Sequence, residues 1–243
     1  MQEPRKDLRA YLDRLIHRFL NAKSIAGQLK TIGEWGTPKG DGVLDLGAYF
    51  FQLASYSMSR TLFVELYLIV SEREDRSLRD WLRKAGEHAS ALGPTRSNRS
   101  ISGNGREPVP VHEYREIVKE HLSLLDANSD LVDRLKSRRD KAIAHLDKSY
   151  FDGRKSIGAD FPVSSAEIDD LISVISDILR EHHSYVFESS LTMEISSART
   201  VDQILRYARA WKRARSDKEL IKEGFRPVDY IRDVYPSEEA YER

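Results

Sequence analysis

SSAEIDDLISVISDILREHHSYV, residues 164–186, is the stretch that decides the fold class. Ser164 and Glu167 have the spacing of a capping box, in which each side chain bonds the backbone N–H of the other residue. Apolar residues then recur every three or four positions, which predicts an amphipathic helix with one buried face. The predicted inner positions are Ile168, Leu171, Ile172, Ile175, Ile178, Leu179 and Val186. His182 falls in phase with them, so we expect an inward, hydrogen-bonded histidine.

The same helical period extends outward from this segment in both directions. It covers residues 8–19, 44–70, 77–89, 114–125, 129–145 and 200–211. The stretch from 44 to 70 is rich in aromatic residues and predicts one long, mostly buried helix. Residues 93–110 read as a polar loop, and the sequence has no alternating pattern of the strand type. We therefore expect an all-α helical bundle over residues 1–195, with a charged helical C-terminal extension over 196–243.

Composition restricts the chemistry. The 243 residues include 39 basic and 39 acidic side chains, so the formal net charge is zero and any nucleic-acid contact must come from a local patch. Cysteine is absent, which excludes thiol nucleophiles, disulfides and zinc–thiolate sites. The chain also shows no HExxH pattern, paired-carboxylate motif or acidic metal cluster, and we expect neither a metal nor a cofactor.

Membrane insertion and secretion are not expected. The most apolar stretch, residues 43–70, is interrupted by Asp45, Arg60 and Glu65, which a membrane span tolerates poorly. The first residues show no basic segment followed by an apolar one, as a secretory signal would. The lack of cysteine suits a reducing compartment, so we expect a cytoplasmic protein without a membrane partner.

Paired arginines precede a histidine in RRDKAIAH, residues 138–145. An arginine binds phosphate bidentately, and a histidine exchanges protons near neutral pH. A metal-independent ribonuclease needs these groups when the ribose 2′-hydroxyl attacks the phosphate. One histidine does not readily perform both proton transfers, but two copies related by a two-fold axis would supply two.

Helical spacing leaves two alternatives open. Arg138 lies seven residues before His145, on nearly the same helix face, whereas Arg139 lies six before, about 120° away. Spacing therefore favours Arg138. A structural interpretation also stands, because cations in the last turns of a helix favourably oppose its dipole and pair with nearby carboxylates.

The segment RRDKAIAHLD, residues 138–147, resembles the signature of the HEPN superfamily, an arginine followed by four to six residues and a histidine. Its form RDKxxAHLD resembles the abortive-infection, AbiU-type branch. Residues 50–85, FFQLASYSMSRTLFVELYLIVSEREDRSLRDWLRKA, resemble the upstream region of that branch, where a long apolar helix precedes a Ser-Leu-x-x-Trp-Leu turn. The resemblance extends over roughly residues 43–186.

The resemblance implies that the helical bundle over residues 1–195 is HEPN-like and forms a homodimer through its motif helices. It also implies RNA as substrate and often metal-independent endoribonuclease activity in phage defence or a toxin-like role. Arg139 and His145 would be the catalytic pair, and Asp140 would orient the arginine. Arg138 would contact phosphate, with Lys141 and Asp147 as supporting or RNA-binding residues. Asp147 stands where HEPN toxins adenylylated by a partner carry a tyrosine, although an antitoxin or regulatory partner remains compatible with the family. The alternative is a non-catalytic helical module that binds RNA or protein.

Overall fold

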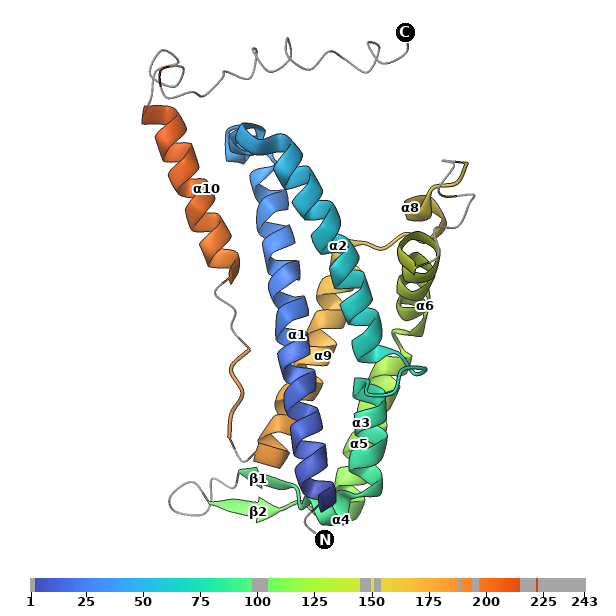
Figure 1. Ribbon diagram of the computed structural model, residues 1–243. Coiled ribbons are helices and arrows are strands. Elements are labelled where there is room, and N and C mark those ends of the chain that lie inside the picture. The colour runs from blue at the N-terminus through green and yellow to red at the C-terminus, as the bar shows by residue number, and fades with distance from the viewer. Residues whose placement is uncertain are drawn as a thin grey trace. The chain divides into compact units, whose positions relative to one another are not determined.

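A computed structural model describes residues 3–97, 105–144, 150, 154–187, 189–193, 197–214 and 222. Within these ranges the chain is almost entirely helical, which confirms the predicted all-α class (Figure 1). The α-helices are α1 Glu3–Trp35, α2 Ala48–Val70, α3 Leu78–Glu87, α4 Ala89–Leu92, α5 Val111–Asp126, α6 Ser129–Arg138, α8 Ile157–Asp160, α9 Ser165–Phe187 and α10 Ser197–Ala214. Two 3₁₀ turns, η1 Pro38–Gly40 and η2 Val43–Gly47, precede α2, and a π-helical segment, η3 Arg139–Ala144, follows α6.

The chain divides into two compact units. Unit 1 comprises Met1–Ile25 and Ser59–Ile195, and unit 2 comprises Ala26–Met58 and Ser196–Arg243. Both α1 and α2 contribute residues to both units. The predicted division of the chain at residues 195 and 196 stays a prediction.

The core of unit 1 is formed by the inner faces of its helices. Its largest fully buried side chains include Phe19 of α1, Leu66 of α2, Trp81 of α3, Tyr114 of α5 and Leu171 of α9. Removing a large apolar side chain of this kind from water stabilises the fold by about 1.5–3 kcal/mol. The indole N–H of Trp81 also donates to the Leu8 carbonyl at 2.9 Å and so fixes α3 against α1.

Helix α9 starts as the sequence predicts. The Ser164 backbone N–H donates to Glu167 Oε2 at 2.8 Å, and the Glu167 N–H donates to Ser164 Oγ at 3.2 Å. Both halves of the capping box are therefore present. His182 is fully buried on the inner face of this helix, as its phase predicts.

The polar connection over residues 93–110 contains two strands that its sequence does not signal. β1 Thr95–Ser97 pairs antiparallel with β2 Arg106–Pro108. Arg96 lies opposite Glu107, and its Nε donates to a carboxylate oxygen of Glu107 at 2.7 Å. The prediction of a plain loop is therefore wrong for these residues, because short strands held by cross-strand polar pairs lack the apolar alternation that identifies a longer strand.

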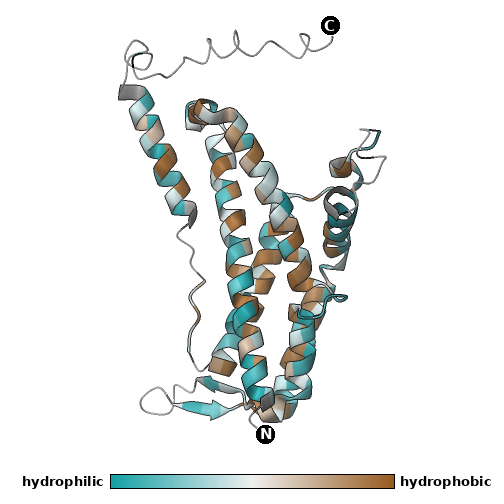
Figure 2. Cartoon of the chain, viewed as in Figure 1, coloured by the Kyte–Doolittle hydropathy of each residue, from teal (hydrophilic) through white to brown (hydrophobic). Residues whose placement is uncertain are grey.

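The stretch from 44 to 70 is helical from Ala48, but the prediction that it is mostly buried is wrong for its first half. The buried residues of α2 lie in its second half, from Leu62 to Val70. Large apolar side chains earlier in the stretch are 43–78% exposed, namely Leu46, Tyr49, Phe50, Leu53 and Tyr56. Figure 2 shows brown residues all along this helix. Hydrophobicity alone did not reveal which of them find a partner within the chain.

Unit 2 has its own small core. Trp35, Val43 and Leu205 are buried together, and the Trp35 indole N–H donates to Asp202 of α10 at 3.0 Å. A Cβ added at Gly40 would lie 1.9 Å from the Trp35 carbonyl oxygen, so this close approach requires glycine. Helix α10 is thereby anchored to the turns that follow α1.

Candidate functional site

The arginine–histidine motif spans a change of helix type. Helix α6 ends at Arg138, and Arg139 to Ala144 continue as a π-helix. The sequence predicted one helix from Ser129 to about His145, so its last turns differ from the prediction. A π-helical turn bonds i to i+5, and such segments occur frequently at functional sites. The α-helical spacing that favoured Arg138 therefore does not apply to this segment. His145 and Asp147 lie outside the described residues.

Arg139 is held by three groups. Its Nε donates to Asp140 Oδ1 at 2.7 Å, and its Nη1 donates to Glu74 Oε1 at 3.2 Å. The guanidinium carbon lies 4.1 Å from the centroid of the Tyr67 ring. These contacts fix the plane of the guanidinium group, while 23% of the side chain remains exposed. The contact with Asp140 is the one that the resemblance implies.

The charge of Arg139 is preserved by these partners. Burial acts to lower the pKa of the guanidinium, but the hydrogen bond to Asp140 and the nearby Tyr67 and Glu74 outweigh it and raise the pKa. Arg139 is therefore a fixed cation that two carboxylates offset. An incoming phosphate would compete with Glu74 for the same N–H groups.

Arg138 faces a different set of partners, although it is adjacent in sequence. Its Nε donates to the Phe161 carbonyl at 2.6 Å, and its guanidinium lies 5.0 Å from the centre of the Phe63 ring. Burial lowers its pKa, and the positive charge of Arg134 lowers it further. The two arginines of the motif thus do not converge on one group in this structure.

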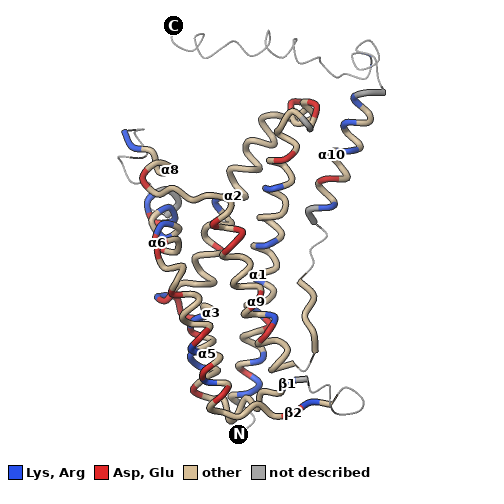
Figure 3. The backbone as a smooth tube through the Cα atoms, turned by 180° about the vertical axis from the view of Figure 1, so that it is seen from behind, with Lys and Arg blue, Asp and Glu red and all other residues tan. Residues whose placement is uncertain are grey.

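Lys141 also faces the segment before α9. Its ammonium lies 4.6 Å from the ring of Phe161 and 5.7 Å from that of Tyr150. One turn before Arg138, Arg134 donates to Glu167 at 2.6 Å. A row of cations therefore runs along one side of α6 and η3, and Figure 3 shows the blue residues of α6 near α8.

Tyr67 and Glu74 contact Arg139, and neither was predicted from the sequence. They lie at the end of α2 and in the connection to α3, 65 positions before Arg139 in the case of Glu74. No spacing or motif marks them, because these contacts form only when the end of α2 and the connection after it lie against η3. The resemblance includes this region but assigns no role to either residue.

A second group of titratable side chains is enclosed in unit 1. Tyr114 Oη lies 2.9 Å from His182 Nδ1, and His182 Nε2 lies 3.0 Å from His121 Nδ1. His121 Nε2 is 3.3 Å from Glu181, which also accepts from the Tyr185 hydroxyl at 2.7 Å. Burial lowers the pKa of His182 to about 3, so its imidazole is neutral. We call this chain of contacts the histidine network; its central residue, His182, is fully buried.

Neither a metal cluster nor a membrane span is found in the part of the chain that the structure describes. No three described His, Asp or Glu side chains are grouped as a metal site would require. No described helix combines the length and apolar character needed to cross a bilayer.

The all-α fold and the Arg-x₅-His sequence of residues 139–145 are the features that the HEPN resemblance implies. The family model of the AbiU2 HEPN proteins matches residues 37–216, most of the 243 residues, and the chain belongs to this abortive-infection family. No curated protein and no solved structure gave a significant match.

Proposed function

We propose that this protein is a metal-independent endoribonuclease of the HEPN type that acts in phage defence or as a toxin. The observation that carries the proposal is the state of Arg139, a charged guanidinium oriented by Asp140 and Tyr67 and partly open to solvent. It lies at the start of the π-helical segment that leads to His145. Membership in the AbiU2 family supports the same activity.

The chemistry needs a base, an acid and a cation. His145 of one copy removes the proton from the ribose 2′-hydroxyl, whose oxygen attacks phosphorus. Arg139 replaces its bond to Glu74 with bonds to the phosphate and offsets the charge that develops there. The 5′-oxygen leaves with a proton from the second histidine, contributed by the other copy of a homodimer. The products are a 2′,3′-cyclic phosphate and a 5′-hydroxyl.

The test is cleavage of mixed cellular RNA in EDTA by the purified wild type, His145→Ala and Arg139→Ala. Lys136→Ala, which removes a cation from the last turn of α6 without touching the motif, is the matched control. We expect cleavage with cyclic phosphate ends by the wild type and the control, and none by the other two variants. Unchanged cleavage by His145→Ala would contradict the proposal.

The alternative is a non-catalytic helical module that binds RNA or protein. It is favoured by one observation: Arg134, Arg138 and Arg139 all have partners within the chain. It predicts RNA binding without turnover, weakening with salt if phosphates are contacted. Binding that salt does not affect would indicate a protein partner instead.

A further inference from the structure

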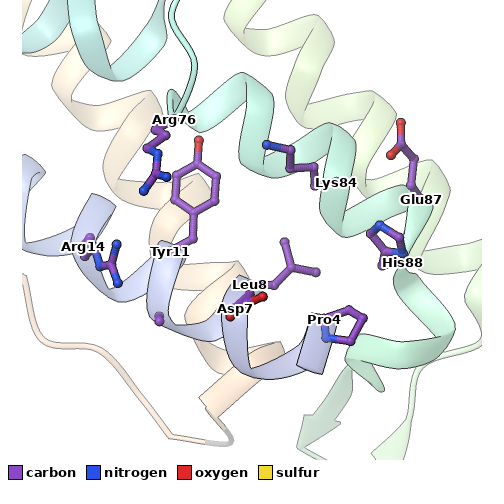
Figure 4. A pocket seen from close by; sticks show the side chains of 10 residues that line it. Pro4, Asp7, Leu8, Tyr11, Arg14, Arg76, Lys84, Glu87 and His88 are labelled. Atoms are coloured by element: carbon purple, nitrogen blue, oxygen red, sulfur yellow. The ribbon is translucent and has the colours of Figure 1, made fainter. Parts of the chain in front are cut away.

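A hollow of about 770 Å³ lies in unit 1 between the first half of α1 and α3 (Figure 4). The two helices run antiparallel there, because Tyr11 contacts Ser77 and Asp80 while Leu8 accepts from Trp81. The volume falls in the range of small-molecule sites. None of its lining residues belongs to the arginine–histidine motif.

One wall of the hollow is fixed by a dense set of hydrogen bonds. The Tyr11 hydroxyl lies 2.8 Å from the Ser77 carbonyl oxygen and 3.0 Å from Asp80 Oδ2. The same carboxylate oxygen accepts from Lys84 Nζ at 2.8 Å and from the Arg76 backbone N–H at 3.3 Å. Burial acts to raise the pKa of Asp80, but these donors outweigh it and lower the pKa. Asp80 is therefore an anion that holds the wall in place.

Arg76 stands in a conformation that arginine rarely adopts. Its φ of 78° is in the left-handed region, where a side chain is strained. Such strain persists only where surrounding contacts enforce it, and it concentrates at functional positions. Here Asp80 enforces it through the backbone N–H of Arg76. Figure 4 shows the guanidinium group of Arg76 beside the Tyr11 ring.

The charges in the hollow are unevenly placed. Arg14 and Arg76 flank Tyr11 at one end, and among the described residues neither side chain has a hydrogen-bond or ion-pair partner. Glu87 and His88 lie at the other end of α3, about 14 Å further along its axis. Apolar Leu8 lines the space between the two ends. A ligand that matches this layout carries anionic groups at one end and hydrogen-bond donors at the other.

We infer that the hollow binds a free nucleotide, with its phosphates between Arg14 and Arg76 and its base toward Glu87 and His88. Unpaired guanidinium groups bind phosphate oxygens in two parallel hydrogen bonds. The Glu87 carboxylate accepts from the amino groups of a base. Asp7 and Glu87 also line the hollow and would repel the phosphates of a continuing strand, which favours a single nucleotide over RNA.

The experiment is titration calorimetry of the full-length protein with ATP, GTP, pyrophosphate and adenosine. We expect a nucleoside triphosphate to bind more tightly than pyrophosphate or adenosine alone. Arg14→Ala and Arg76→Gly should each weaken this binding by about tenfold or more. Glycine is chosen at position 76 because it adopts the left-handed conformation without strain.

Arg83→Ala is the matched control, since Arg83 also lies on α3 but pairs with Glu72 and does not line the hollow. Its nucleotide affinity should equal that of the wild type. Absence of binding at millimolar nucleotide would overturn the inference, as would an equal loss in Arg83→Ala. If an RNA strand without a terminal phosphate binds more tightly and displaces the nucleotide, the hollow is a site for an RNA strand instead. All of these readouts are independent of RNA cleavage.

Discussion

The guanidinium group of Arg139 contacts one aromatic ring and two carboxylates. The two carboxylates affect the binding of a phosphate in different ways. Asp140 is the next residue in the chain and moves with Arg139, so it orients the group. Glu74 belongs to a distant segment and occupies N–H groups that a phosphate would need. Glu74 therefore competes with the substrate of the proposed reaction.

Glu74→Gln should strengthen RNA binding. The substitution removes the negative charge but keeps the shape, so Arg139 exchanges this partner for a phosphate at lower cost. In a His145→Ala background, which prevents cleavage, we expect the dissociation constant to fall about two- to fivefold. Fluorescence anisotropy with a labelled single-stranded RNA measures it. Glu72→Gln, which affects the Arg83 pair only, is the control, and weaker binding by Glu74→Gln would show that Glu74 positions Arg139.

Among the helices, the caps could be predicted from the sequence, because they depend on neighbouring residues. Contacts between segments far apart in the sequence could not be predicted. Ser164 and Glu167 cap α9, and Ser77 accepts from the Asp80 N–H at the start of α3, because capping depends on residues three apart. Tyr67 and Glu74 could not be found in this way, since their contacts with Arg139 depend on how helices pack. The change to π-helix at Arg139 likewise has no marker in the sequence.

The histidine network links α5 to α9 and makes that contact depend on pH. His182 has a pKa of about 3 in the folded protein, against 6.5 when unfolded, so the unfolded chain binds an extra proton between these values. Its contribution to stability is complete above pH 6.5 and is lost as the pH falls. Hydrogen bonds from His121 and Tyr185 lower the pKa of Glu181 to about 2, from 4.5, which adds a loss in the same direction at lower pH.

We therefore expect the free energy of unfolding to decrease steadily as the pH falls below 6.5, by about 2 kcal/mol at pH 5. Urea denaturation at pH 7, 6 and 5 measures this slope. His182→Gln should flatten it, whereas His183→Gln removes a neighbouring imidazole that is not enclosed and is the control. A slope that His182→Gln leaves unchanged would assign the proton to another group.

For the molecule as a whole, the proposed nuclease site requires residues from two copies of the chain. A net charge of zero gives no long-range attraction to RNA, so the site must concentrate cations locally. A two-fold axis beside the motif would double the cations and histidines in one cleft. The proposed homodimer thus supplies both the acid and the base.

Mixing wild type with His145→Ala tests this arrangement. If dimers exchange subunits and one histidine is insufficient, the rate of RNA cleavage should follow the square of the wild-type fraction. At equal amounts of both chains, about a quarter of the activity should remain. The control is a mixture of the two proteins whose dimers have not exchanged subunits. Differently tagged chains show whether exchange has taken place. A linear dependence after full exchange would show that each chain cleaves alone.

The connection between α2 and α3 carries Glu74 and Arg76 two residues apart. Glu74 reaches Arg139, and Arg76 reaches the hollow beside Tyr11. A single codon gained or lost in this connection would displace both side chains at once. One insertion or deletion in this connection would therefore disturb both sites. A lineage that altered the length of the connection would have to restore both sites together.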